Sequence, residues 1–591
     1  MIPNVQLDNN YKLKCKNKIM KKSTNLFKRQ QLLILAVIII LTNSFSTSIA
    51  QDLSNIKKDN WFDLSGNIGF NLSFSDYGNN YAQQSPWSSV VSGGLNLKIA
   101  GVDIPLSFAY VDGKSSYMHP FTRYGLSPRY KDITLHLGYR NINLSSNIFS
   151  GKTFLGGGTE VNVGAFRFAG FYGEIEEARS FDSTMQNYTP SYSRMGMGGK
   201  IGFTAGSFVL DFVLFKAKDD TTSVKTLMPQ HITPQDNLAA GIFSSFSFLS
   251  HFNFSTEWAV SGHTKDIRTE EIDNESARKY SSFLNVRSNS TMGFNTNNVL
   301  GFYYKTFGLQ LNYRLITQDY QSFGVPNMAT NNQSISVNSN LSLLDSKLNL
   351  SGFFSRSNDN LSKKQIMTST TNTFGTNLNY TFSESFSIDG GYNGTLVEQD
   401  PSTKDTTFSS FGLDNHSFNL NPSYSINMGK LDHRFSLPLD YFFSDMENSN
   451  SEYNSQSLSY TFSPSYSLSI QDLDLSTGIN YSYSNSKADA FVTTRHSVGV
   501  HVNKTFLEKK ELSVNIATNF GIDSYNNNSN NSLSVSGGVS YRLLEQHHFS
   551  LNLTYSNGSQ SSYYNFRSYL SYQWSIPPLS KFLFKNKKDV H

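Results

Sequence analysis

A strict two-residue alternation of apolar and polar side chains constrains this chain more than any other feature. The alternation is clearest between Lys510 and Tyr555. Apolar side chains occupy the even positions from Leu512 to Ile522, interrupted only by Thr518, and small or polar side chains occupy the odd positions. A period of two places the two sets on opposite faces of a β-strand. The segment therefore predicts strands with one apolar and one polar face.

The connections between such segments alternate between short and long over most of the chain. The short ones include 100–103, 307–308 and 428–430, and the long ones include 76–88, 113–130, 179–192, 265–293 and 523–531. Outer-membrane β-barrels have short periplasmic turns and long extracellular loops, whereas a soluble sandwich has no reason to keep this asymmetry. The sequence therefore predicts an all-β fold, a single large transmembrane antiparallel up-and-down β-barrel. Counting the alternating runs gives about 26 strands, within a range of about 24 to 28.

The composition agrees with a barrel rather than with a soluble domain. Charged residues make up 16% of the chain and aromatic residues 14%, with a mean hydropathy of −0.38. Aromatic girdles and an uncharged polar interior give a membrane barrel this balance. The only cysteine, Cys15, lies in the segment that we expect to be removed, which excludes disulfides and thiolate metal sites in the mature chain.

Residues 1–50 are predicted to be a signal peptide with an extended basic n-region. An unbroken apolar run of ten residues, Leu32–Leu41, is followed by small residues that end at Ala50, so cleavage is expected before Gln51. A membrane-spanning helix needs roughly 20 apolar residues, about twice the length of this run. Met20 precedes two lysines and is the better candidate for the true start of translation.

The remaining chain divides into a short periplasmic lead-in (51–60), the transmembrane barrel (61–576) and a basic C-terminal tail (577–591). The final strand is predicted at Tyr564–Ile576, where aromatic side chains share one face. This organisation resembles the large, plugless outer-membrane β-barrels of Gram-negative bacteria, the porins and secretion-associated barrels. The resemblance is architectural and covers essentially the whole mature chain. It implies location in the cell outer membrane, with outer-membrane lipid and the barrel assembly machinery as partners.

The sequence offers little support for catalysis or metal binding. Gly151-Lys152-Thr153 resembles the end of a phosphate-binding loop, but Ser146 stands where that loop requires glycine. The adjacent His547 and His548 have no neighbouring third ligand. We therefore expect no enzyme, no metal site and no cofactor. The net charge of +4 arises from the basic leader, so the mature chain is slightly acidic and nucleic acid is not an expected partner.

Two groups of residues are candidate functional residues. Polar side chains on the face opposite the apolar one are predicted to point into the lumen, namely His136, Arg140, Asp474, Asn480, Asn515, Asn519, Asp523 and Asn552. The longest predicted loop, Lys265–Gly293, combines charges with an apolar patch that an exposed loop has no reason to keep. It is the candidate constriction, through Asp266, Glu270, Glu271, Phe283, Leu284 and Val286.

Two classes of function are compatible with these features. The first is a conduit, a porin, channel or export pore that passes solutes or polypeptide through a polar lumen. The second is a non-conducting surface scaffold whose extracellular loops bind a secreted or surface protein. An empty barrel of this width would leak, so loops or a partner are expected to fill part of it. The conduit is the preferred hypothesis.

The cleavage site gives a first prediction. Because the apolar run is too short to span the membrane, the mature protein should begin at Gln51. Mass spectrometry of the protein isolated from outer membranes measures this terminus directly. An intact terminus at Met1 or Met20 would contradict the prediction.

Overall fold

The computed structural model describes residues 62–77, 86–112, 123–181, 189–225, 228–272, 284, 286–402, 409–449, 454–489, 491–525, 528–558 and 564–579. The predicted leader, the Ala50–Gln51 cleavage site, the lead-in and most of the C-terminal tail lie outside these residues. No helix in the described ranges is long and apolar enough to cross a membrane.

The described chain is almost entirely β-structure. Its first half comprises β1 (Phe62–Tyr77), β2 (Trp87–Ile99), β3 (Val102–Asp112), β4 (Arg123–Leu126), β5 (Arg129–Tyr130), β6 (Ile133–Asn141), β7 (Thr153–Val163), β8 (Phe166–Glu176), β9 (Ser193–Ala205), β10 (Phe208–Asp220), β11 (Asp236–Phe248), β12 (Phe252–Thr264), β13 (Ser290–Tyr304) and β14 (Phe307–Ile316). The second half comprises β15 (Asn332–Leu343), β16 (Leu348–Asp359), β17 (Met367–Thr381), β18 (Phe386–Pro401), β19 (Phe411–Met428), β20 (Leu431–Ser436), β21 (Leu439–Asn448), β22 (Ser455–Phe462), β23 (Ser465–Ile470), β24 (Leu475–Ala488), β25 (Phe491–Phe506), β26 (Leu512–Tyr525), β27 (Asn528–Leu543), β28 (His547–Gly558) and β29 (Tyr564–Ile576). A single-turn 3₁₀ helix, Gln471–Leu473, precedes β24.

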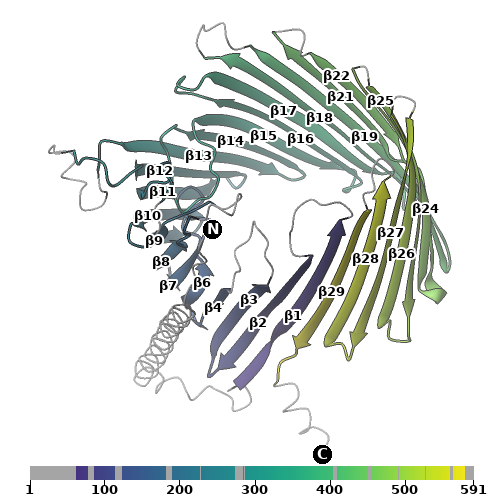
Figure 1. Cartoon of the computed structure of the whole chain (residues 1–591), viewed down its shortest axis with the longest axis horizontal. Coiled ribbons are helices and arrows are strands. Elements are labelled where there is room, and N and C mark those ends of the chain that lie inside the picture. Colours follow the sequence, from purple (N-terminus) through teal and green to yellow (C-terminus); the bar gives the residue numbers. More distant parts are fainter. Residues whose placement is uncertain are drawn as a thin grey trace, which may run out of the picture.

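The strands form one closed antiparallel β-barrel (Figure 1). Each strand pairs with its neighbours in sequence, and β1 closes the ring by pairing with β29 from Gly66↔Ile576 to Tyr77↔Asn565. Three barrel strands are each divided into two segments, β4 with β5, β20 with β21, and β22 with β23. The 29 segments therefore form 26 barrel strands, which confirms the predicted fold class and strand number.

Proline accounts for all three divisions. Pro128, Pro438 and Pro464 lie in the short gaps, and proline has no N–H to donate to a sheet. The pairing continues through the proline carbonyls. Pro438 O accepts a hydrogen bond from Ser463 N at 3.0 Å, and Pro464 O accepts one from Tyr481 N at 3.0 Å. The wall therefore remains closed across the gaps.

The strand register separates two chemically different faces. On β26, Ile516 and Phe520 lie on one face and are 55% and 46% exposed, whereas Asn515 and Asn519 lie on the other. Large apolar side chains recur on the first face around the barrel, where lipid would cover them. The second face is the lumen face. Residues paired across neighbouring strands lie on the same face of the sheet, and following these pairs around the barrel leads from Asn515 and Asn519 to the face against which two loops pack inside the ring.

The number of strands sets the width of the lumen. If 26 strands are spaced about 4.8 Å apart and tilted by about 40°, a circular barrel measures about 50 Å between opposite backbone walls. Inward side chains from one wall cannot reach the other across such a distance. Any closure of this lumen must therefore come from loops or from a bound partner.

Two predicted boundaries are wrong. The asparagine-rich tract after Tyr525 was expected to be a turn, but β27 begins at Asn528 and pairs with β26. Likewise, β4 and β5 occupy the end of the predicted loop 113–130. At the start of β27, cross-strand hydrogen bonding from an existing neighbour outweighs the low β-propensity of Asn, because propensity is a weak and context-dependent term.

The facing of β26 gives a second prediction. Ile516→Arg should impair barrel assembly, because an arginine on the lipid face costs about 2–4 kcal/mol near mid-membrane. Asn515→Arg should assemble normally, because that side chain faces the lumen. The fraction of heat-modifiable, folded barrel on a semi-native gel measures both. Equal damage from the two neighbouring substitutions would contradict the assigned faces.

Candidate functional site

Among the connections that the structure describes in full, two fold into the lumen and pack against one part of its wall. The first is the loop 142–152, between β6 and β7, and the second is the loop 317–331, between β14 and β15. Both loops follow strands that run in the same direction as β1. They therefore lie at the same end of the barrel as the long connection between β1 and β2. We name them inner loop 1 (142–152) and inner loop 2 (317–331).

A single carboxylate holds inner loop 1 against the wall. Glu257 on β12 is 6% exposed, and its two oxygens accept hydrogen bonds from the loop. Ser145 Oγ donates to Oε1, Ser146 Oγ donates to Oε2 at 2.5 Å, and Asn147 N donates to Oε1 at 3.1 Å. A buried carboxylate needs such donors, because an uncompensated charge away from water is strongly unfavourable.

The two inner loops also bind each other. Tyr320 Oη donates a hydrogen bond to the Asn147 carbonyl at 2.6 Å, and Ser322 Oγ donates to the Ile148 carbonyl at 2.5 Å. Phe149 and Gly324 form a parallel β-bridge, and Ser150 N donates to Gly324 O at 3.0 Å. Burial raises the pKa of Tyr320, so its hydroxyl remains a donor at any physiological pH.

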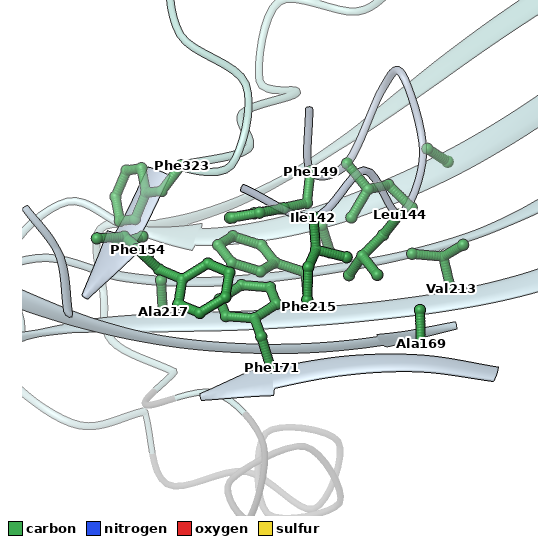
Figure 2. Packing of buried hydrophobic residues seen from close by; sticks show 14 of the residues in the cluster. Ile142, Leu144, Phe149, Phe154, Ala169, Phe171, Val213, Phe215, Ala217 and Phe323 are labelled. Atoms are coloured by element: carbon green, nitrogen blue, oxygen red, sulfur yellow. The ribbon is translucent and has the colours of Figure 1, made fainter. Parts of the chain in front are cut away.

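An apolar cluster lies beneath this contact (Figure 2). The Phe149 ring is centred 4.3 Å from Phe171 on β8 and 5.2 Å from Phe215 on β10, and all three side chains are buried. The cluster consists of Ile142, Leu144, Ile148, Phe149, Phe154, Ala169, Phe171, Ile175, Val213, Phe215, Ala217, Ala239, Ala259, Ile316, Tyr320 and Phe323. Burying each large side chain contributes about 1.5–3 kcal/mol, so the loops form a stable part of the fold.

Glycines on the wall make room for the loops. A Cβ at Gly198 would lie 2.6 Å from the Leu144 side chain, and one at Gly293 would lie 2.0 Å from the Tyr320 backbone nitrogen. A Cβ at Gly158 would likewise meet Ile142 at 2.6 Å. The close approach of inner loop 2 to β13 therefore requires glycine at 293.

Ion pairs complete this part of the wall. Arg194 on β9 forms two hydrogen bonds with Asp219 on β10, at 2.6 and 3.0 Å, and its guanidinium lies 3.6 Å from the centre of the Phe323 ring. Arg167 and Asp211 pair at 2.7 Å on the same face. The arginines thus neutralise buried carboxylates, and one of them also covers a ring of inner loop 2.

The predicted lumen residues lie in three places. His136 contacts Ser127 Oγ at 3.0 Å and Glu160 at 3.6 Å, and Arg140 donates to Ser107 Oγ at 2.6 Å. These two therefore belong to the wall formed by β3–β7.

The others lie on β24–β28 and in the turn before β24. Asn480 and Asn519 flank Gly499, and Asn515 and Asn552 flank Gly538, all on the polar face. Asp523 pairs with Arg495 on the same face at 3.4 Å. Asp474 lies in the turn before β24, in a left-handed conformation, and binds Lys510 at 2.6 Å.

Part of the predicted constriction loop lies outside the described residues, including Phe283. Within the described part, Asp266 pairs with Arg268 at 2.8 Å, and hydrogen bonds from Arg268 lower the pKa of Asp266. Glu271 pairs with Arg287 at 2.9 Å. Leu284 is buried near Gly262 on β12, a position whose register is that of the outer face. Within the described ranges, no hydrogen bond joins Glu270 or Val286 to the inner loops, and Val286 is not part of the apolar cluster beneath them. The role of the loop Lys265–Gly293 as the constriction stays a prediction.

Sequence reasoning missed Glu257 and both inner loops. A signal was present, however. The segments of β8 (FRFAGFYGEIE) and β10 (FVLDFVLFKAKDD) carry apolar side chains on both faces, and such runs are typical of strands buried on both sides. This pattern predicts a cover over the lumen face of these two strands, but it does not indicate which loops supply the cover.

No protein-family model matches the sequence, and no curated protein matches it either. Among solved structures, the chain is similar to the P pilus usher (PapC) translocation pore, with 11% identity, a TM-score of 0.36, and coverage of 87% of this chain and 100% of that one. It is also similar to the outer membrane protein OpdK from Pseudomonas aeruginosa (10% identity, TM-score 0.30, 59% and 95% coverage). A third is a BenF-like porin from Pseudomonas fluorescens Pf-5 (8% identity, TM-score 0.28, 87% and 99% coverage).

The role of Glu257 gives a third prediction. Glu257→Ala should release inner loop 1, because three donors lose their acceptor and each such charge-assisted hydrogen bond is worth about 1.5–3 kcal/mol. Chymotrypsin added to the folded protein in detergent should then cleave after Phe149, which the parent protects. Ser255→Ala, on the same face of β12, is the matched control and should leave the loop protected. Equal cleavage of both variants would show that Glu257 is not the anchor.

Proposed function

We propose that this barrel is a conduit in the outer membrane, with a lumen that two inner loops narrow from one side. The observation that carries the proposal is the contrast between two parts of the lumen wall. Most inner-face side chains on β8, β10 and β12 are buried under the loops, whereas those on β15–β29 are mostly half-buried or exposed. Within the described residues, both inner loops pack against strands β7–β14.

We call the lumen wall formed by β15–β29 the uncovered wall, and its side chains suit contact with water. Serine, threonine and asparagine dominate its inward positions, and on β22 and β23 every inward residue from Ser455 to Ser469 is Ser or Thr. Hydroxyl and amide groups hydrogen-bond water readily and carry no charge. A lumen lined in this way favours passage of polar cargo with weak charge selectivity, because selectivity follows from the charges that line a pore.

The outward face supports a location in the outer membrane. Large apolar side chains on this face are exposed along strands on every side of the ring, including Phe212, Trp258, Ile335, Phe418 and Ile516. In water such a surface would drive aggregation, whereas in lipid it is the required complement of the hydrocarbon chains. Solutes and polypeptide both remain candidate cargoes for a lumen of this width.

Conductance gives a fourth prediction. The purified protein should produce stable ion currents in a planar bilayer, with only weak preference between K⁺ and Cl⁻. Glu257→Ala should raise or destabilise the single-channel current, because inner loop 1 no longer holds its place in the lumen. Deleting Asp266–Ser290 tests the constriction predicted from the sequence, and it should have a smaller effect if the inner loops narrow the lumen.

Two results would contradict these expectations. If neither parent nor variants conduct, the conduit is wrong and the surface scaffold becomes the better hypothesis. If only the Asp266–Ser290 deletion raises the current, the constriction lies in that loop rather than in the inner loops.

A further inference from the structure

A band of carboxamide side chains crosses the uncovered wall. Its asparagines lie on the inner face of β15, β16, β17 and β19, and they are Asn340, Asn349, Asn377, Asn379 and Asn419. All five are exposed to the lumen. Together they line a hollow of about 370 Å³, and we call them the amide band.

Two neighbouring residues on β18 determine how the side chains of the amide band are arranged. Gly391 on β18 lies between Asn377 and Asn419 in the register, and a Cβ at this glycine would meet the two amide oxygens at 3.0 and 2.5 Å. The glycine lets both carboxamides lie along the wall. Asn379 donates to Asp389, which occupies the only acidic position of this hollow.

A second hollow of about 370 Å³ continues from Asn419 along the wall. On its floor Phe442 of β21 is 41% exposed and lies between Ser417 and Ser459 in the register, so neither neighbour covers the ring. Asp440, two residues away on the same face, lies between Asn419 and Thr461. Among the described residues, Asp440 has no ion-pair or side-chain hydrogen-bond partner.

The side chains that line these two hollows favour a neutral ligand with many hydroxyl groups over an anion or an apolar molecule. An anion finds no basic side chain among their lining residues, and an apolar ligand finds only one inward aromatic ring. Carboxamides both donate and accept hydrogen bonds, as the hydroxyl groups of a sugar do, and a carboxylate accepts from pairs of hydroxyls. An exposed aromatic ring beside such groups can pack against the C–H face of a pyranose ring.

We propose that the amide band and the adjoining Phe442–Asp440 hollow bind a neutral oligosaccharide of several units. The two hollows share Asn419, so one extended chain can occupy both. This inference rests on the proposed conduit and names its cargo class, in preference to polypeptide. The carboxamides and carboxylates align the sugar hydroxyls, and Phe442 supplies the apolar contact.

Binding can be measured separately from conduction. The full-length mature protein, held in a detergent without a sugar headgroup, is titrated with maltohexaose in a calorimeter, and with a Gly/Ser peptide of similar length. The parent should bind the hexasaccharide and not the peptide. Phe442→Ala should weaken the affinity roughly five- to tenfold, which is what the loss of one aromatic contact amounts to.

Tyr569→Ala is the matched control. Tyr569 is also an aromatic residue on the lumen face and is also 41% exposed, but it lies on β29, outside the two hollows. Its substitution should leave the affinity unchanged. A second variant, Asp440→Asn, keeps the size of the side chain and should weaken binding without affecting assembly, which the semi-native gel checks.

The outcomes distinguish the site from the conduit. Absence of hexasaccharide binding, equal loss in Phe442→Ala and Tyr569→Ala, or binding of the peptide instead would each overturn the sugar site. If the protein conducts without binding sugar, the conduit stands and the site is wrong. If it binds sugar at the predicted residues without conducting, the site stands and the conduit is wrong.

Discussion

Every backbone N–H and C=O inside a membrane must find a partner within the protein, and this requirement governs the whole structure. An open sheet would expose two edges to lipid, so the chain satisfies it only by closing β1 against β29. Closure at 26 strands then makes a lumen too wide for side chains to fill. The prolines show how strictly the rule holds, because their carbonyls still accept hydrogen bonds where the N–H is missing.

The width of the ring explains why one part of its wall is covered by loops and another part is left exposed to the lumen. The inner surface of β7–β14 combines an apolar cluster and glycines with paired charges, and two loops pack against it. Glu257 fixes the first loop by accepting from three donors. Strands β15–β29 keep a hydroxyl and carboxamide surface exposed to the lumen. A polar wall facing a loop-covered wall gives a narrowed passage without a separate plug domain in the described chain. The amide band and Phe442 lie on the polar wall, next to the passage.

The sequence predicts the barrel and its strand number, because period-two alternation follows directly from strand geometry. The alternation in the segment 512–522 is the clearest example, and β26 contains it with the expected faces. Inner loops 1 and 2 were not predictable in the same way. Their positions depend on contacts such as Tyr320 with Asn147, which join residues 173 positions apart. Asn528 shows the opposite limit, since pairing with β26 overrides a composition typical of turns.

The contrast between the two parts of the wall can be measured most directly by chemical labelling. The only cysteine, Cys15, lies in the predicted leader, so single cysteines can be introduced without background in the mature chain. Ser459→Cys on β22 and Ala239→Cys on β11 both face the lumen, one on the polar wall and one under the inner loops. We predict rapid reaction of the first with a membrane-impermeant thiol reagent and protection of the second. Equal labelling at both positions would contradict a lumen in which loops cover the wall around β11 and leave the wall around β22 exposed.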